Sequence, residues 1–247
     1  MKVIFLGTNG WYCTETGETP CILIDSKKYY IVLDAGNGIR KLDKYIIENK
    51  PVYLFLSHFH LDHTFGLHVL LKFKFEKGIT IVVGENRIKD LNTLVNPPFT
   101  QNFKGFSSKI SVLELPKDLS KIPFPVESFK MFHQDEDAGY RFKLDEKIIA
   151  YSGDTGVIEN SIPLAKNADL LIHECSNPVG MTSPKWGHAN PEEVANLAKK
   201  AGVKKLALTH FDPDFYLTLE QRNVSQEAAR KIFPETYAMR DDQVIEL

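Results

Sequence analysis

Three histidines and an aspartate lie within six consecutive positions of the stretch SHFHLDH, residues 57–63, directly after a short apolar run. Neutral imidazole and carboxylate groups are ligands that suit zinc and similar divalent ions. His58 and His60 are two residues apart, so in an extended segment their side chains point to the same side. Four such groups are too many for one closed site, so the stretch predicts two metal ions that share further ligands from elsewhere in the chain. The alternative, a histidine-rich surface loop, is disfavoured by the apolar residues on either side.

Polar residues of the same kinds end several other segments that have the composition of strands. Runs of β-branched and aromatic residues between turns predict strands at 2–7, 21–25, 29–34, 52–57 and 79–84, and again at 126–132, 139–144, 147–153, 169–174 and 203–210. Strands that end together bring their last residues to a common edge, where sites tend to be built. Five of the runs end on or beside a potential ligand: His58, His133, Asp154, His173 and His210.

Helices are predicted between these strands in both halves of the chain. Helical periodicity covers 66–75 and 87–94, and the segment 191–202 has clear ends. Asn190 is placed to cap that helix, Pro191 occupies its first position, Glu193 completes a capping box and Gly202 ends it. Strands and helices in both halves predict two sheets packed face to face with helices outside.

The composition predicts one soluble domain. The chain has 247 residues, a formal net charge of −2 and no linker-like segment, so we predict a single domain over residues 1–247. The charge balance gives no attraction to nucleic acid or to a membrane surface, and no apolar run approaches the roughly 18 residues of a membrane span. Three cysteines without CxxC spacing, and a first segment that looks like a strand instead of a signal peptide, predict a cytoplasmic location.

The motifs together resemble the metallo-β-lactamase superfamily along nearly the whole chain. SHFHLDH is similar to the HxHxDH signature of that family, and LDAGNGI at 33–39 is similar to its DxG turn. The order of His133, GYRF, YSGDT, LIHECS, GHAN and LALTHF resembles the ribonuclease Z branch. The resemblance implies an α/β (α+β) fold, namely the four-layer αββα sandwich of metallo-β-lactamases.

The same resemblance implies a dinuclear metal site with a bridging water or hydroxide. Two divalent ions are expected, Zn²⁺ in the first place, with Mn²⁺ or iron as alternatives. Asp34 is a candidate for orienting a ligand through a hydrogen bond. By resemblance, the first ion would be held by His58, His60 and His133, the second by Asp62, His63 and His210, and Asp154 would bridge them.

Two further residues are assigned to catalysis by the resemblance. Glu174 would orient His188, and His188 would assist the leaving oxygen as a general acid or as an oxyanion stabiliser. The alternative for His188 is a loop histidine near a helix cap. Asp62 joins these two in the predicted catalytic set, whereas His173 is expected to be structural and His68 receives no role.

The predicted activity is hydrolysis of a small phosphodiester. The alternatives are a carboxylic-ester, lactone or sulfate-ester hydrolase on the same metals, and a non-catalytic cofactor-binding or carrier protein, which the full set of seven ligands disfavours. Transfer RNA is not expected as a substrate. Members of the ribonuclease Z branch bind transfer RNA with a long basic arm, which is inserted between the third metal histidine and the bridging aspartate. In this chain the corresponding residues are His133 and Asp154, and only twenty residues separate them. A cyclic nucleotide or a phospholipid headgroup would enter between the loops of Trp11 and Trp186.

The segment Asn92–Ser108 is rich in Pro, Asn and Phe. It is either a substrate lid that brings Phe99, Phe103 and Phe106 near the substrate, or a segment packed against the sandwich.

Overall fold

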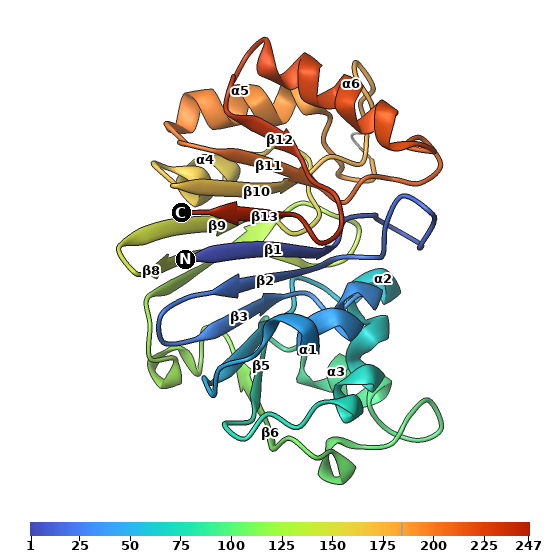
Figure 1. Cartoon of the computed structure of the whole chain (residues 1–247), viewed down its shortest axis with the longest axis vertical. Coiled ribbons are helices and arrows are strands. Elements are labelled where there is room, and N and C mark those ends of the chain that lie inside the picture. Colours follow the sequence, from blue (N-terminus) through green and yellow to red (C-terminus); the bar gives the residue numbers. More distant parts are fainter. Residues whose placement is uncertain (184) are drawn as a thin grey trace.

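Two β-sheets packed face to face form the middle of the computed structural model, which describes residues 1–183 and 185–247 (Figure 1). Both sheets are mixed and follow the strands that the sequence predicts, with β6, β12 and β13 added. The first sheet has the order β13 (Val244–Glu246), β1 (Lys2–Gly7), β2 (Cys21–Asp25), β3 (Tyr30–Leu33), β4 (Val52–Phe55), β5 (Ile79–Val83) and β6 (Ile110–Glu114). The second has the order β12 (Thr236–Ala238), β11 (Leu206–Thr209), β10 (Leu170–Glu174), β9 (Lys147–Tyr151), β8 (Asp137–Leu144) and β7 (Val126–Met131).

Apolar side chains pack in three layers, one between the sheets and one on each outer face. Successive side chains of a strand point to opposite faces of a sheet. In β4, Phe55 therefore packs between the sheets, while Leu54 packs under the helices of the outer face. In β11, Ala207 faces the other sheet and Leu208 faces the helices. The predicted four-layer αββα sandwich is confirmed.

Helices cover the outer face of each sheet (Figure 1). The first sheet is covered by α1 (Leu42–Tyr45), α2 (Leu61–Thr64) and α3 (Ile88–Leu94), and by the 3₁₀ helices η1 (Asn37–Lys41) and η2 (Phe65–Lys72). The second is covered by α4 (Ser161–Ala165), α5 (Pro191–Ala201) and α6 (Leu219–Arg230). Two short 3₁₀ turns, η3 (Phe103–Gly105) and η4 (Leu119–Lys121), lie in loops. The capping box of α5 has both predicted hydrogen bonds.

Two helices differ from the sequence prediction. The helix expected at 66–75 is the 3₁₀ helix η2, which ends at Lys72 because Phe73 turns extended and buries its ring. Helix α6 was not predicted, since few of its residues are apolar and its periodicity is weak. The signal that predicts it is a second capping box, in which Thr218 and Gln221 pair as Asn190 and Glu193 do in α5.

Helix α6 carries an arginine that is fully buried and holds the loop after β1. The Arg222 guanidinium donates hydrogen bonds to Thr8 Oγ1 at 2.8 Å, to the Met239 carbonyl oxygen at 3.1 Å and to Asn9 Oδ1. It also lies 4.6 Å from the centre of the Phe211 ring. These hydrogen bonds offset the cost of burying the charge, and they attach the first loop of the chain to its last helix.

Parallel strands bring the site residues to one edge of the sandwich. Strands β3 to β6 are mutually parallel in the first sheet, as are β9 to β12 in the second. Their carboxyl ends lie on the side of the molecule where α2 begins (Figure 1). The chain's two ends meet in the pairing of β13 with β1, and the last two strands join different sheets. These connections support the proposal of a single domain. In the described part of the chain, none of the helices has the length and apolarity needed to span a membrane.

Candidate metal centre

The loop after β4 is held by the tight turn that follows β3. The Ala35 N–H donates to the His63 carbonyl oxygen at 2.8 Å, and the Gly66 N–H donates to the Ala35 carbonyl oxygen at 2.7 Å. A Cβ at Gly36 would lie 2.3 Å from the Asp62 carbonyl oxygen, and one at Gly66 would lie 2.5 Å from the Gly36 carbonyl oxygen. Glycine is therefore required at both positions, because the two backbones touch. Gly66 lies in a helix, and its lack of a side chain also allows this close contact.

Asp34, in the same turn, orients a histidine of the loop. Its Oδ2 atom lies 2.8 Å from His63 Nδ1, and its carboxylate also accepts hydrogen bonds from Ser57 N–H and from the Tyr151 hydroxyl. The backbone of Asp34 is in the left-handed region, with φ of 58°. A hydrogen bond at Nδ1 directs the lone pair of Nε2 towards the centre of the site, which is how metal-binding histidines are commonly held.

Asp137 orients His58 in the way that Asp34 orients His63. This role of Asp137 was not predicted from the sequence. Its Oδ2 atom lies 3.1 Å from His58 Nδ1 and accepts a hydrogen bond from the Asp154 N–H at 2.8 Å. Asp137 opens β8 and is buried. The only signal in the sequence is an acidic residue at the start of a strand shortly after His133. Burial and the negative charge of Asp154 raise the pKa of Asp137 well above its usual value.

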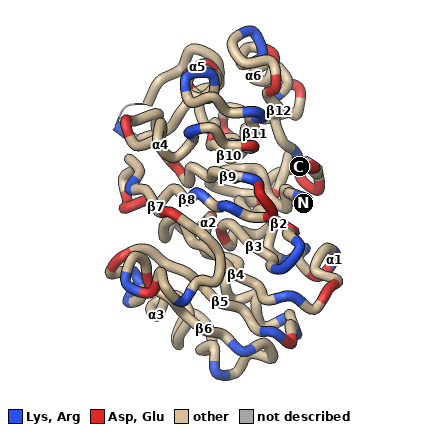
Figure 2. The backbone as a smooth tube through the Cα atoms, turned by 90° about the vertical axis from the view of Figure 1, so that its left-hand side faces the viewer, with Lys and Arg blue, Asp and Glu red and all other residues tan. Residues whose placement is uncertain are grey.

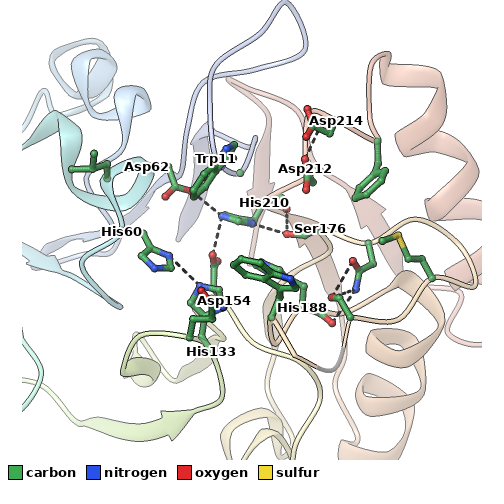
Figure 3. A pocket seen from close by; sticks show the side chains of 18 of the residues that line it. Trp11, His60, Asp62, His133, Asp154, Ser176, His188, His210, Asp212 and Asp214 are labelled. Atoms are coloured by element: carbon green, nitrogen blue, oxygen red, sulfur yellow. Dashed lines mark hydrogen bonds and ion pairs between the residues drawn. The ribbon is translucent and has the colours of Figure 1, made fainter.

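The seven predicted ligands all reach one place, and Figure 3 labels His60, Asp62, His133, Asp154 and His210 among them. Asp154 is central, with its Oδ2 atom 3.1 Å from His210 Nε2 and 3.3 Å from His63 Nε2. His60 Nδ1 lies 3.1 Å from His133 Nε2. The ligand atoms fall into two groups whose members lie within 4.8 Å of one another: His58, His60 and His133 in one, and Asp62, His63, Asp154 and His210 in the other. Asp154 Oδ2 is also 4.0 Å from His58 Nε2, between the two groups.

Neighbouring backbone makes room for His210. This residue has a φ of 55°, in the left-handed region, and its Nδ1 atom lies 2.9 Å from Ser176 Oγ. A Cβ at Gly10 would lie 2.4 Å from the His210 ring, so only glycine fits there. The left-handed conformation costs free energy for residues other than glycine, and residues that adopt it tend to occur at functional sites.

The centre attracts positive charge strongly. Four carboxylates are buried around it, those of Asp34, Asp62, Asp137 and Asp154, and in the described residues no lysine or arginine forms an ion pair with any of them. Burial by itself lowers the pKa of His63, but the charges of Asp154, Asp62 and Asp34 outweigh it and raise that pKa well above its usual value. Buried carboxylates without cationic partners are costly unless cations offset them.

The donor atoms fit divalent metal ions. Among the described residues, His58 Nε2, His133 Nδ1 and Asp154 Oδ1 are buried without a hydrogen-bond partner. Burial and the positive charge of His63 lower the pKa of His58 to about 4, so its imidazole is neutral at physiological pH and can bind a metal. Histidines that are neutral, or that release their proton when an ion binds, form together with carboxylates a donor set for zinc and related ions.

Glu174 and His188 lie beside this centre. Glu174 Oε1 is 2.8 Å from His188 Nδ1, and the buried carboxylate also accepts hydrogen bonds from the N–H groups of Thr155, Ser176 and Ala189. Burial alone would lower the pKa of His188, but the charge and hydrogen bond of Glu174 raise it to about 9. His188 therefore carries a proton at neutral pH, and the orientation expected from Glu174 is present.

A cavity of about 710 Å³ opens over the metal centre (Figure 3). Trp11 and Trp186 both line it, as expected, together with His188 and ligands from both groups. No residue of the described segment Asn92–Ser108 lines it. Phe106 instead packs into the outer core under the helices, Phe103 packs against that core, and Phe99 is exposed. The lid alternative is therefore wrong for this structure, and the packing alternative holds.

Two other histidines lie away from the centre. His173 was counted among the five strand ends and was expected to be structural, and its strand reaches the centre through the neighbouring residue Glu174. His173 is a residue of β10 and points to the opposite face from Glu174, with its Nδ1 atom 2.8 Å from the Glu174 carbonyl oxygen. His68 is exposed on η2, with its Nδ1 atom beside the Phe65 carbonyl oxygen.

Comparisons with known proteins agree with this geometry. A sequence model of the beta-lactamase superfamily domain matches residues 29–211. The probable metallo-hydrolase YhfI of Bacillus subtilis is 27% identical over 217 residues, which covers 85% of this chain and 86% of that protein. Its crystal structure covers 99% of both chains with a TM-score of 0.82 and 25% identity. The ribonuclease Z of Thermoplasma volcanium is 24% identical over 305 aligned positions, covering 98% of this chain and 95% of that protein. The short form of human tRNase Z shares the fold, with a TM-score of 0.76, 23% identity and coverage of 100% and 99%.

Proposed function

Because this chain belongs to the beta-lactamase superfamily and is a metallo-hydrolase, we propose that it is a dinuclear metal-dependent phosphodiesterase that acts on a small phosphodiester. His58, His60 and His133 would hold one ion, Asp62, His63 and His210 would hold the other, and Asp154 would bridge them. Two divalent ions, Zn²⁺ in the first place with Mn²⁺ or iron as alternatives, would acidify a shared water and offset charge on the substrate's oxygens.

The observation that carries this proposal is the His188–Glu174 pair, which faces the same cavity as the seven ligands. Cleavage of a phosphodiester leaves an alkoxide, which needs a proton. His188 holds one at Nε2, since its Nδ1 atom is engaged by Glu174 at 2.8 Å and its pKa is raised to about 9. Donation of this proton to the leaving oxygen is general acid catalysis. The relatives named ribonuclease Z support a phosphodiester over a carboxylic or sulfate ester.

Several features argue against transfer RNA as the substrate. The twenty residues between His133 and Asp154 are taken up mostly by the β8–β9 hairpin, whose two-residue turn is Asp145 and Glu146. The alignment with the Thermoplasma ribonuclease Z runs over more positions than this chain has residues, so that relative carries insertions absent here. In Figure 2, seen from the side of the molecule opposite α2, lysine and arginine are interspersed with acidic residues along the backbone. The formal net charge of −2 gives no excess of positive charge for a phosphate backbone, whose neutralisation dominates affinity for nucleic acid.

The test is a substrate panel on enzyme loaded with Zn²⁺ or Mn²⁺. A chromogenic phosphodiester, a lactone and a sulfate ester are compared before and after chelation, and a precursor transfer RNA is added as a fourth arm. We expect metal-dependent cleavage of the phosphodiester and about two ions per chain by elemental analysis. Preference for the lactone or the sulfate ester would replace the proposed substrate class, a single ion would remove the dinuclear assignment, and efficient 3′-end processing would reverse the conclusion on transfer RNA.

Two variants separate the proposed roles. His188→Ala should lower turnover and leave metal content intact, because His188 is placed on the substrate side. Asp154→Ala should disturb both ions, since its carboxylate lies between the two groups of ligands. Loss of metal from the His188 variant would show that it is a ligand and not an acid.

A further inference from the structure

Both tryptophans of this chain lie at the mouth of the cavity. The chain has only two, Trp11 and Trp186, and both line the cavity although 67% and 57% of their surface is exposed. The Trp11 N–H donates to Asp62 Oδ2 at 2.8 Å, and Trp11 has a φ of 57° in the left-handed region. Trp186 stands two residues before His188. Large aromatic rings left open at a cavity indicate a ligand that covers them.

Two aspartates follow His210 in the wall of the same cavity (Figure 3). Asp212 is half-buried and accepts a hydrogen bond from the Asp214 N–H at 2.9 Å, while Asp214 also accepts one from the Tyr12 hydroxyl. In the described part of the chain neither carboxylate forms an ion pair with a lysine or an arginine.

In the described residues the cavity wall contains no lysine or arginine. We call its more exposed lining residues Trp11, Trp186, Phe215 and Asp214, with the half-buried Asp212, the outer wall, and the buried or half-buried metal ligands with His188 the inner cavity. In such a wall a substrate that carried several negative charges would face two carboxylates without any lysine or arginine to offset them. The outer wall is suited instead to a group with positive charge, since carboxylates and the faces of tryptophan rings both attract cations.

We propose that this outer wall, formed by Trp11, Trp186, Phe215, Asp212 and Asp214, binds an ammonium or substituted ammonium group carried by one alcohol of the phosphodiester. This inference rests on the proposed function, and it names the substrate class of the same site. The inner cavity would take the phosphate beside the metal ligands. Asp212 is two residues from His210 and Trp186 is two residues from His188, so the cationic group and the phosphate would lie in adjoining parts of one cavity.

A nucleobase between the two tryptophans is the competing occupant. Bases stack on aromatic side chains, but a neutral base gains no attraction between opposite charges from the two carboxylates, which could only accept hydrogen bonds from its N–H groups. The Asn177 side-chain amide already bonds to Ser183 and to the His188 carbonyl oxygen. The carboxylates and the ring faces are better matched by a cation than by a neutral base.

Intrinsic fluorescence gives a direct binding test, because the two tryptophans that produce the emission both lie in the proposed subsite. Metal-loaded enzyme is titrated with choline, with tert-butanol as a neutral control, with sodium chloride at matched ionic strength, and with adenosine, which carries a base but no phosphate. Choline should change the emission saturably, and Asp212→Asn should weaken its apparent affinity by about fivefold or more. Asp43→Asn, an exposed aspartate of α1 on the outer helical layer, is the matched control. An equal response to tert-butanol, tighter binding of adenosine, or no response to choline would overturn the proposal.

A kinetic test compares two chromogenic phosphodiesters. One is the nitrophenyl ester of phosphocholine, and the other has a tert-butyl group in place of the trimethylammonium group. The ratio of their kcat/KM values should favour the choline ester by about tenfold or more, should fall towards one in Asp212→Asn, and should shrink with added salt. Equal rates for the two esters in the unaltered enzyme would refute the cationic subsite alone. Failure to cleave either ester would refute the phosphodiesterase proposal, and the fluorescence titration would still decide on the subsite.

Discussion

The pairing of Glu174 with His188 makes a quantitative prediction for the pH dependence of turnover. Glu174→Gln keeps the size of a side chain that is 1% exposed but removes its charge. Glu174 lies 2.8 Å from His188 Nδ1 and holds the pKa of His188 at about 9 instead of the ordinary 6.5. That difference corresponds to roughly 3 kcal/mol, at the upper end of what a hydrogen bond to a charged group contributes.

The direction in which turnover changes with pH follows from the role of His188 as an acid. Turnover requires the protonated imidazole, so it should fall as pH rises through the pKa of His188. In Glu174→Gln this alkaline decline should move from about pH 9 to about pH 6.5 or below, because burial without the carboxylate lowers the pKa further. At about pH 8 the variant should retain roughly one thirtieth of the turnover of the unaltered enzyme. Bound divalent ions would lower the pKa in both proteins, so the prediction concerns the difference between them.

The assay is kcat for a phosphodiester with an alkyl leaving group, followed by release of the alcohol, between about pH 5.5 and about pH 10, with metal content measured at each end. The matched control is Glu159→Gln, an exposed residue outside the cavity wall, which should leave the profile unchanged. Because the carboxylate also accepts three backbone hydrogen bonds, the thermal unfolding midpoint of the variant is recorded beside its kinetics. An alkaline decline at the same pH in both proteins, with equal metal content, would refute the assignment of His188 as the acid.

Three further predictions concern stability and the metal ions. Arg222→Met should lower the free energy of unfolding by about 3 kcal/mol in urea, because Thr8 Oγ1 and the Met239 carbonyl oxygen lose the buried arginine that donates to them, whereas Arg230→Met, at the half-exposed end of the same helix, should cost about 1 kcal/mol or less. Asp137→Asn should weaken the more loosely held ion about 10- to 100-fold in competition with a chromogenic chelator, and unchanged affinity would show that Asp137 does not support His58. Chelation should lower the thermal unfolding midpoint and Zn²⁺ should restore it, corresponding to about 3 kcal/mol at an ion concentration a hundred times Kd; an unchanged midpoint would contradict metal binding at the buried carboxylates.

Local patterns in the sequence predicted the strands, two sheets packed face to face and polar residues at the strand ends, whereas the set of seven candidate ligands came from the resemblance to the metallo-β-lactamase superfamily. Apolar runs of strand length mark the buried strands, and a polar residue directly after such a run lies at the end of its strand. The capping residues Asn190 and Glu193 marked α5 in the same way, and the equivalent pair Thr218 and Gln221 marks α6. His173 and Glu174 are neighbours in β10, so their side chains face opposite sides of the sheet. Glu174 therefore lies beside the metal centre and His173 does not.

Only the tertiary structure decided which distant side chains touch. The contact of Asp137 with His58, the anchoring of the first loop by Arg222 and the meeting of Trp11 with Asp212 at one cavity all join segments far apart in the chain. Periodicity reports which face of a segment is buried, but not which other segment covers it, because that depends on strand order and on the conformation of the loops. The residue types of the metal centre could therefore be read from the sequence, whereas the partners that orient them and the wall that faces the substrate depend on how the two sheets pack.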